Sequence, residues 1–232
     1  METVSQLLSR PLPLSTGRTA HVRLSQIRSF LYVLQTCAAL DLTGLVPITD
    51  DASEDFIVGS ELGLTGRFAK NLCDGVSKAL STTTLRHIKF GDYQASEPRI
   101  ENKIPDVVML SMPGCQSVAI LEFKPWWGVR LESYPISRGY MYLVPLQSHL
   151  SQLVNYMRIN MLKFGALSTY KTTVFVKRTD AYHFELSLPV DEGASNPTVR
   201  ECLLAMAAFA SEGRLLPNAG RLADKSGMRM NK

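Results

Sequence analysis

The chain has 232 residues, of which 45% are hydrophobic and 20% are charged, with 25 lysines and arginines against 21 aspartates and glutamates. This composition excludes a disordered or supercharged chain, and the length predicts one large domain or a core domain with an extension. No apolar run approaches the ~20 residues of a membrane span, and the proline-interrupted N-terminus differs from a signal peptide. We therefore expect a soluble intracellular protein of the cytoplasm or nucleus, without a membrane partner.

Two helices are expected in the first third of the chain. Apolar residues at helical spacing predict a helix over residues 22–40, which Gly44 and Pro47 should end. Ser60 is a suitable N-cap for a second helix that runs to Leu80.

The centre of the chain then changes to β-prone runs. Residues 86–93, 104–112 and 117–124 are short, apolar and separated by turn-rich segments. The dipeptide Pro113-Gly114 is a strong turn signal between the last two runs. A meander of three strands is predicted.

Helical periodicity returns over residues 146–165, where a glycine is expected to end the helix. Residues 172–177 and 182–188 predict a hairpin of two strands, and Asn196-Pro197 predicts the start of a last helix. This order of helices and strands predicts an α/β fold with a mixed central β-sheet flanked by helices.

The residues with the clearest chemical potential lie in the predicted meander. Asp106 opens one strand, and Glu122, Phe123 and Lys124 end the next. Because side chains alternate across a strand, Glu122 and Lys124 should share one face while Phe123 points to the other. The hairpin should bring Asp106 near Glu122, and a carboxylate at the end of a buried strand requires a partner or a metal.

Two carboxylates on neighbouring strands suit a hard cation such as Mg²⁺ or Mn²⁺. A cation held there would polarise a phosphodiester and activate water, and Phe123 would offer it a backbone carbonyl. Lys124 would orient or deprotonate the water or stabilise the developing charge. A structural ion pair among Asp106, Glu122 and Lys124 is the alternative interpretation.

These residues carry a resemblance to a known family. The pattern P-D-x(15)-E-x-K, filled by Pro105, Asp106, Glu122 and Lys124, resembles the PD-(D/E)XK nuclease superfamily. The resemblance implies a restriction-endonuclease-like core in the order helix, three strands, helix and strand, over about residues 60–178. It also implies Mg²⁺ or Mn²⁺ as the cofactor and nucleic acid as the partner.

The helices around the meander add to this resemblance. Gln152 and Tyr156 resemble the Q-x-x-x-Y motif of the RecB-like and lambda-exonuclease-like branch, in which the Gln is expected near the active site and the Tyr near the substrate backbone. Family members often supply an acid early in the preceding helix, for which Glu61 is the candidate. For Gln152 and Tyr156, the alternative is an ordinary polar helix face. For Glu61, it is a first-turn acid that complements the helix dipole.

A stretch rich in aromatic and basic residues follows the E-x-K strand. It holds aromatic residues interleaved with arginines, in the order Trp126, Trp127, Arg130, Tyr134, Arg138, Tyr140 and Tyr142. Such aromatic rings can stack on bases while the charges meet phosphates. The segment from residue 124 to 178 carries eight basic residues and one acid, which suits a polyanion. A loop that packs its aromatic side chains on the sheet is the alternative.

The sequence thus predicts three parts: an N-terminal helical extension packed on the core (1–59), a PD-(D/E)XK nuclease-like domain (60–215) and a basic flexible tail (216–232). The predicted function is metal-dependent hydrolysis of phosphodiester bonds in nucleic acid, with DNA expected ahead of RNA. A non-catalytic module that keeps the fold and binds nucleic acid or protein is the rival hypothesis.

Overall fold

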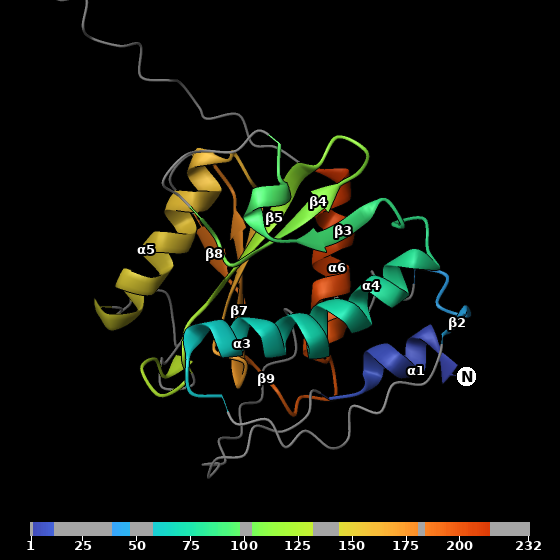
Figure 1. Ribbon diagram of the computed structural model, residues 1–232, viewed down its shortest axis with the longest axis horizontal. Helices are drawn as coiled ribbons and strands as arrows, with labels where there is room; N and C mark the ends of the chain where they lie inside the picture. Colours follow the sequence, from blue (N-terminus) through green and yellow to red (C-terminus); the bar gives the residue numbers. More distant parts are fainter. Residues whose placement is uncertain are drawn as a thin grey trace, which may run out of the picture.

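The computed structural model describes residues 2–11, 39–46, 58–97, 104–131, 144–180 and 184–213 (Figure 1). The helix predicted over residues 22–40 lies almost entirely outside these ranges, and the tail predicted over 216–232 lies entirely outside them. Both therefore stay predictions. None of the helices in the described ranges has the length and apolarity that crossing a membrane requires.

A mixed seven-stranded sheet forms the centre of the protein. Its strands lie in the order β3-β4-β5-β6-β7-β8, and β9 pairs with β7 beyond the end of β8. Among the strand pairs of the described residues in this sheet, only β5–β6 is parallel. The strands are β3 (Ile88–Gly91), β4 (Val107–Ser111), β5 (Gln116–Phe123), β6 (Phe164–Ser168), β7 (Thr172–Arg178), β8 (Phe184–Leu186) and β9 (Val190–Asp191).

The predicted three-strand meander is confirmed, because β3, β4 and β5 pair as consecutive antiparallel neighbours. The chain turns between β4 and β5 at Pro113-Gly114, and Cys115 completes the turn with a positive φ of 48°. The predicted hairpin of β7 and β8 is confirmed as well.

The helix predicted after Ser60 is also confirmed. It consists of α3 (Glu61–Phe68), a π-helical segment (Ala69–Cys73) and α4 (Asp74–Ser81) in direct succession. The Ser60 hydroxyl caps the helix by accepting a hydrogen bond from the Gly63 amide at 3.1 Å. The cap fixes the first turn, which carries Glu61.

The helix predicted over residues 146–165 is too long, and the strand β6 that follows it was not predicted. The helix α5 (Val144–Ile159) ends where Met161 adopts a φ of 56° and the Leu162 amide donates to the Met157 carbonyl at 2.7 Å. This is the hydrogen bond of a Schellman motif, without its usual glycine. Gly165, predicted to end the helix, instead lies in β6, where a Cβ atom would come within 2.9 Å of Met157 Sδ.

The last helix, α6 (Val199–Glu212), begins later than predicted. Thr198 is its N-cap rather than Asn196, and Thr198 and Glu201 form a capping box. The Thr198 hydroxyl also donates to the Leu8 carbonyl at 2.6 Å, in the unpredicted helix α1 (Val4–Ser9). Strands β1 (Glu2–Thr3) and β2 (Leu45–Val46) pair beside α1.

Helices cover both faces of the sheet (Figure 1). One core holds apolar residues of α1, α3, α4 and α6 together with one face of the sheet. A second core joins the other face to α5. The protein is therefore a mixed α/β fold with a central sheet flanked by helices, as predicted, and the N-terminal helix α1 packs against α4 and α6.

Candidate functional site

The strand β5 separates its side chains between the two cores. Leu121 and Phe123 belong to the core with α3, α4 and α6, whereas Ile120 belongs to the core with α5. By the same alternation, Glu122 and Lys124 project on the α5 face of the sheet. The prediction that Phe123 points away from them is confirmed, because its ring lies 3.9 Å from the Phe68 ring, centroid to centroid.

Asp106 is attached directly to the end of β5. It lies just before β4, and its Oδ2 atom accepts a hydrogen bond from the Phe123 amide at 2.7 Å. The sheet register makes this contact possible, because Val107 pairs with Leu121 across the hairpin. The Asp106 carboxylate is thereby held next to Glu122, the residue before Phe123.

Lys124 joins two of the predicted acids. Its Nζ atom lies 2.7 Å from Glu122 Oε1 and 3.2 Å from Glu61 Oε1. The Glu122 side chain is 2% exposed and that of Lys124 15%, while Glu61 is half exposed. The structure therefore brings Glu61, from the first turn of α3, to the site at the start of β4 and the end of β5.

Burial dominates the electrostatics of the two inner carboxylates. Desolvation, followed by repulsion from Asp106, raises the pKa of Glu122 to about 7, although Lys124 opposes the shift. Desolvation likewise raises the pKa of Asp106, against the hydrogen bond from Phe123 and the attraction of Lys124. The two acids are thus crowded at neutral pH, and additional positive charge would relieve their repulsion.

Lys124 stays protonated in this setting. Burial acts to lower its pKa, but the hydrogen bond and charge of Glu122, together with Glu61, outweigh burial, so the pKa of Lys124 lies above its usual value. At neutral pH the side chain is a fixed cation and hydrogen-bond donor. It is therefore suited to hold an anion or orient water rather than to remove a proton.

One atom of the site is left without a partner. Glu122 Oε2 is buried and accepts no hydrogen bond from the part of the chain that the structure describes. Within that same part, no three His, Cys, Asp or Glu side chains gather closely enough to form a metal centre by themselves. The residues present fit a hard cation that takes oxygen atoms from Asp106 and Glu122 and keeps several waters, as Mg²⁺ does.

The helix α5 contributes a titratable residue that is not among the predicted site residues. His149 is partly buried, and its pKa is lowered by desolvation and by the charge of Lys124, against the opposing charge of Glu61. The first turns of α5 therefore adjoin the site. No motif in the sequence marks His149, because its position depends on how α5 docks on the sheet.

The predicted pair on α5 does share one helix face. Gln152 Nε2 donates to the Tyr156 hydroxyl at 2.9 Å, and Tyr156 is 7% exposed and packs in the core under α5. No contact described in the structure joins either residue to Asp106, Glu122 or Lys124. Gln152 lies three residues after His149. It is therefore nearer in sequence than Tyr156 to the helical turn that adjoins the site.

Tyr156→Phe is expected to lower the free energy of unfolding by about 1 kcal/mol, because it deletes the acceptor of the Gln152 amide. A double-mutant cycle with Gln152→Ala, measured by urea denaturation, should give a coupling energy of similar size. Additive effects would show that the hydrogen bond makes no net contribution to stability.

The predicted aromatic segment is only partly described. Trp126 packs in part on the core, and its ring meets the Trp127 ring edge-on at 4.9 Å, centroid to centroid. The Lys171 ammonium lies 5.7 Å from the centre of the Trp126 ring, and Arg130 is exposed. Arg138 lies outside the described residues, so its predicted role stays a prediction.

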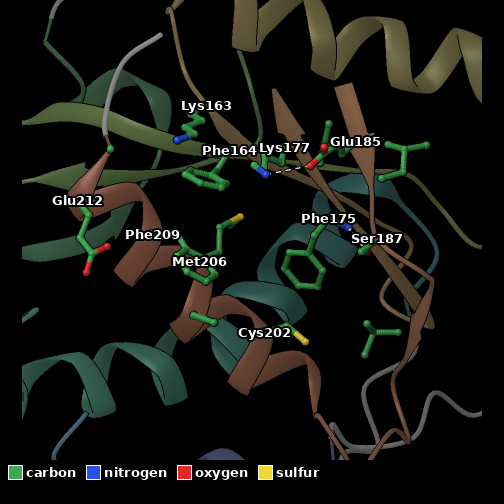
Figure 2. A pocket seen from close by; sticks show the side chains of 15 residues that line it. Lys163, Phe164, Phe175, Lys177, Glu185, Ser187, Cys202, Met206, Phe209 and Glu212 are labelled. Atoms are coloured by element: carbon green, nitrogen blue, oxygen red, sulfur yellow. Dashed lines mark hydrogen bonds and ion pairs between the residues drawn. The ribbon is translucent and has the colours of Figure 1, made fainter. Parts of the chain in front are cut away.

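A pocket of about 640 Å³ lies elsewhere, between α6 and strands β6 to β9. Figure 2 shows the aromatic rings of Phe164, Phe175 and Phe209 around it, with the ion pair of Lys177 and Glu185 at one side. Its lining belongs mainly to the core on the α6 face, opposite the face of Glu122 and Lys124. None of the predicted site residues lines this pocket.

Comparison with protein-family models, with curated proteins and with solved structures finds no match for this chain. The class that the structure defines by itself is a mixed α/β protein with a seven-stranded sheet and a buried carboxylate–lysine cluster at one end of its central hairpin.

Proposed function

We propose that this protein is a metal-dependent nuclease of the PD-(D/E)XK type, which hydrolyses phosphodiester bonds in nucleic acid. The observation that carries the proposal is the meeting of Asp106, Glu122 and Lys124 at one place, with a buried Glu122 oxygen that lacks a hydrogen-bond partner. A structural ion pair between Glu122 and Lys124 does not explain that oxygen or the crowding of two carboxylates.

The order of the elements supports the same proposal. The chain runs from α3 and α4 through the meander β3-β4-β5 to α5 and then to β6, which pairs parallel to β5. This is the order helix, three strands, helix and strand that the resemblance implies. The strand β6 completes it, although its first two residues fall in the helix predicted over residues 146–165.

Each residue of the cluster has a role in this proposal. Asp106 and Glu122, with the backbone carbonyl of Phe123, would hold Mg²⁺ or Mn²⁺, which when bound supplies Lewis-acid activation of the phosphodiester and of water. Lys124, a fixed cation on the same face, stabilises negative charge on the reacting phosphate and orients water. Glu61 holds the Lys124 ammonium from the solvent side, in addition to any part it has as a ligand.

Asp106→Asn is expected to lower cleavage by at least ~100-fold, because it keeps the acceptor for the Phe123 amide but removes the charge that attracts the cation. The assay is cleavage of single-stranded and duplex DNA and RNA in Mg²⁺ or Mn²⁺ and in EDTA. Glu185→Gln is the matched control, because Glu185 is an exposed acid paired with a lysine at the far edge of the sheet. Cleavage that persists in EDTA and in Asp106→Asn would contradict the proposal.

The rival is a non-catalytic module that binds nucleic acid or protein. One observation favours it: Lys124 is already paired with both Glu122 and Glu61, as a structural lysine would be. Calorimetric titration with Mn²⁺ separates the two functions. The nuclease should bind Mn²⁺ and lose that binding in Asp106→Asn, whereas the rival should bind none.

A further inference from the structure

The pocket between α6 and strands β6 to β9 has no part in the proposed reaction (Figure 2). Its volume of about 640 Å³ lies within the range of roughly 300–1,000 Å³ that is usual for sites that bind small molecules. The sheet separates it from Glu122 and Lys124, which project on the α5 face. The pocket is therefore a separate site, and what it binds does not depend on the nuclease function.

The helix α6 leaves this space open because two of the residues that face it are small. Cys202, Ala205, Met206 and Phe209 line the pocket and recur at the spacing of one helical face. The side chains of Cys202 and Ala205 are too short to fill the gap between the helix and the sheet. Met206 is flexible, and a methionine can adapt its shape to a ligand.

Aromatic rings form the rest of the wall. Phe175 of β7 points to the α6 face, because its neighbours Val174 and Val176 belong to the core under α5. Phe164 of β6 stacks on Phe209, with ring centroids 6.1 Å apart and an interplanar angle of 24°. Phe175 and Phe209 are only partly buried. An apolar molecule in the pocket would remove these rings from water, which favours binding in proportion to the area covered.

Most polar side chains of the lining are already paired. Lys177 and Glu185 form an ion pair at 2.9 Å on one side of the pocket (Figure 2). The Ser187 hydroxyl accepts a hydrogen bond from the Phe175 amide at 2.9 Å and donates one to the Leu188 carbonyl at 2.8 Å. These groups require no polar partner from a ligand, so the body of the ligand should be apolar.

Lys163 differs from these groups. Its half-buried ammonium lies 5.6 Å from the centre of the Phe164 ring, in the wall of the pocket, and forms no ion pair with the residues that the structure describes. Glu212 also lines the pocket, but it is exposed at the end of α6, where water screens its charge. The ammonium beside the ring is less hydrated, so it attracts an anionic group at the pocket more strongly.

We propose that this pocket binds an amphipathic carboxylate of the medium-chain fatty-acid class. The aliphatic chain lies against Phe164, Phe175 and Phe209, and the carboxylate meets the Lys163 ammonium. Such a chain carries no polar atom that would be left unpaired against the apolar lining. A polyanion does not fit, because the described lining offers it a single ammonium that is not already paired with an acid.

Calorimetric titration of the full chain with decanoate tests the inference through a ligand series that needs no variant. Hexanoate should bind at least tenfold more weakly than decanoate, because each buried methylene contributes about fourfold to the affinity. Decyltrimethylammonium, which has a chain of the same length and the opposite charge, should also bind at least tenfold more weakly.

Lys163→Met tests the charge contact, because it keeps the apolar stem and removes the ammonium. It should weaken decanoate binding by about tenfold or more and leave the binding of decan-1-ol unchanged. Lys89→Met is the matched control, since Lys89 is an exposed lysine on β3, at the opposite edge of the sheet. This variant should bind every ligand as the wild type does.

Methyl labelling of the methionines locates the bound chain by NMR. The Met206 signal, assigned with Met206→Leu, should shift when decanoate is added, because Met206 lines the pocket. The Met157 signal should stay in place, because Met157 packs on the opposite face of the sheet.

Four results would overturn the inference. They are no binding of decanoate, equal binding of the anionic and cationic chains, a Lys163→Met variant that binds decanoate as the wild type does, and a Met206 signal that does not move. Decanoate binding that appears only in a Leu215→Ser, Leu216→Ser double variant would assign the pocket to the chain's own segment after Gly213, and would overturn the inference as well.

Discussion

Lys124→Met is expected to lower the rate of phosphodiester cleavage by ~100-fold or more, since loss of one donor aimed at developing negative charge costs that much in other enzymes. Among the described residues, Lys124 is the one cation within hydrogen-bond distance of Glu122. The methionine keeps the apolar stem and removes only the ammonium group. Single-turnover rates at saturating Mg²⁺, measured beside the melting temperature of each variant, separate chemistry from stability.

Lys177→Met is the matched control for this experiment. Lys177 also pairs with a glutamate, at 2.9 Å, but it lies on β7 opposite Glu185 of the edge strand β8 and is about half exposed. Its replacement should leave the cleavage rate unchanged, because exposed ion pairs of this kind contribute little even to stability. A Lys124→Met variant that melts lower but cleaves at the wild-type rate would show that the Glu122–Lys124 pair is structural.

The local geometry of the cluster could be predicted from the sequence because it follows from strand periodicity. A run of apolar residues that ends in E-x-K places Glu122 and Lys124 on one face of a strand, and the structure agrees. The turn at Pro113-Gly114 made a hairpin the natural connection to Asp106. Its hydrogen bond to the Phe123 amide was not predictable, because it depends on the register of β4 against β5.

The strand β6 was missed because a short apolar run after a helix fits either a helix or a strand. Its residues follow a helix end that has no glycine, since Met161 takes the left-handed conformation there. A helix end was therefore predicted at Gly165. This glycine instead lies in β6, where Met157 packs so closely that a Cβ atom would not fit. Only the tertiary packing of α5 on the sheet distinguishes these two uses of a glycine.

Two helix starts were missed although the sequence carries a signal for each. Thr3 with Gln6 and Thr198 with Glu201 both match the capping-box pattern of a hydroxyl residue followed three residues later by Glu or Gln. At α6, the dipeptide Asn196-Pro197 led to a predicted helix start that is two residues too early. His149, in contrast, had no signal, because its place beside the cluster arises from the docking of α5.

The raised pKa of Glu122 makes the stability of the metal-free protein depend on pH. The folded-state pKa of about 7 exceeds the value of 4.5 in the unfolded chain, so the folded state holds the proton more tightly. The resulting stability is present below pH 4.5 and is lost as the pH rises through about 7. A difference of this size corresponds to roughly 3 kcal/mol in the free energy of unfolding.

Glu122→Gln is therefore expected to stabilise the metal-free protein at pH 8 by up to about 3 kcal/mol and to change its stability little near pH 4.5. The amide resembles the protonated carboxyl in shape and carries no charge for Asp106 to repel. Urea denaturation of both proteins across this pH range measures the difference, and Glu185→Gln should show none of it, since Glu185 is exposed.

Mn²⁺ should stabilise the wild-type protein rather than the Glu122→Gln variant. It should raise the melting temperature of the wild type at pH 8 by mass action and leave Glu122→Gln nearly unchanged, because the variant has lost one of two carboxylates that favour the cation. The shift for the wild type should shrink as the pH falls below about 7, where a proton competes for Glu122. If Glu122→Gln instead melts lower than the wild type at every pH, and Mn²⁺ moves neither protein, the Glu122 carboxylate stabilises the fold through Lys124 and the cluster is not a metal site.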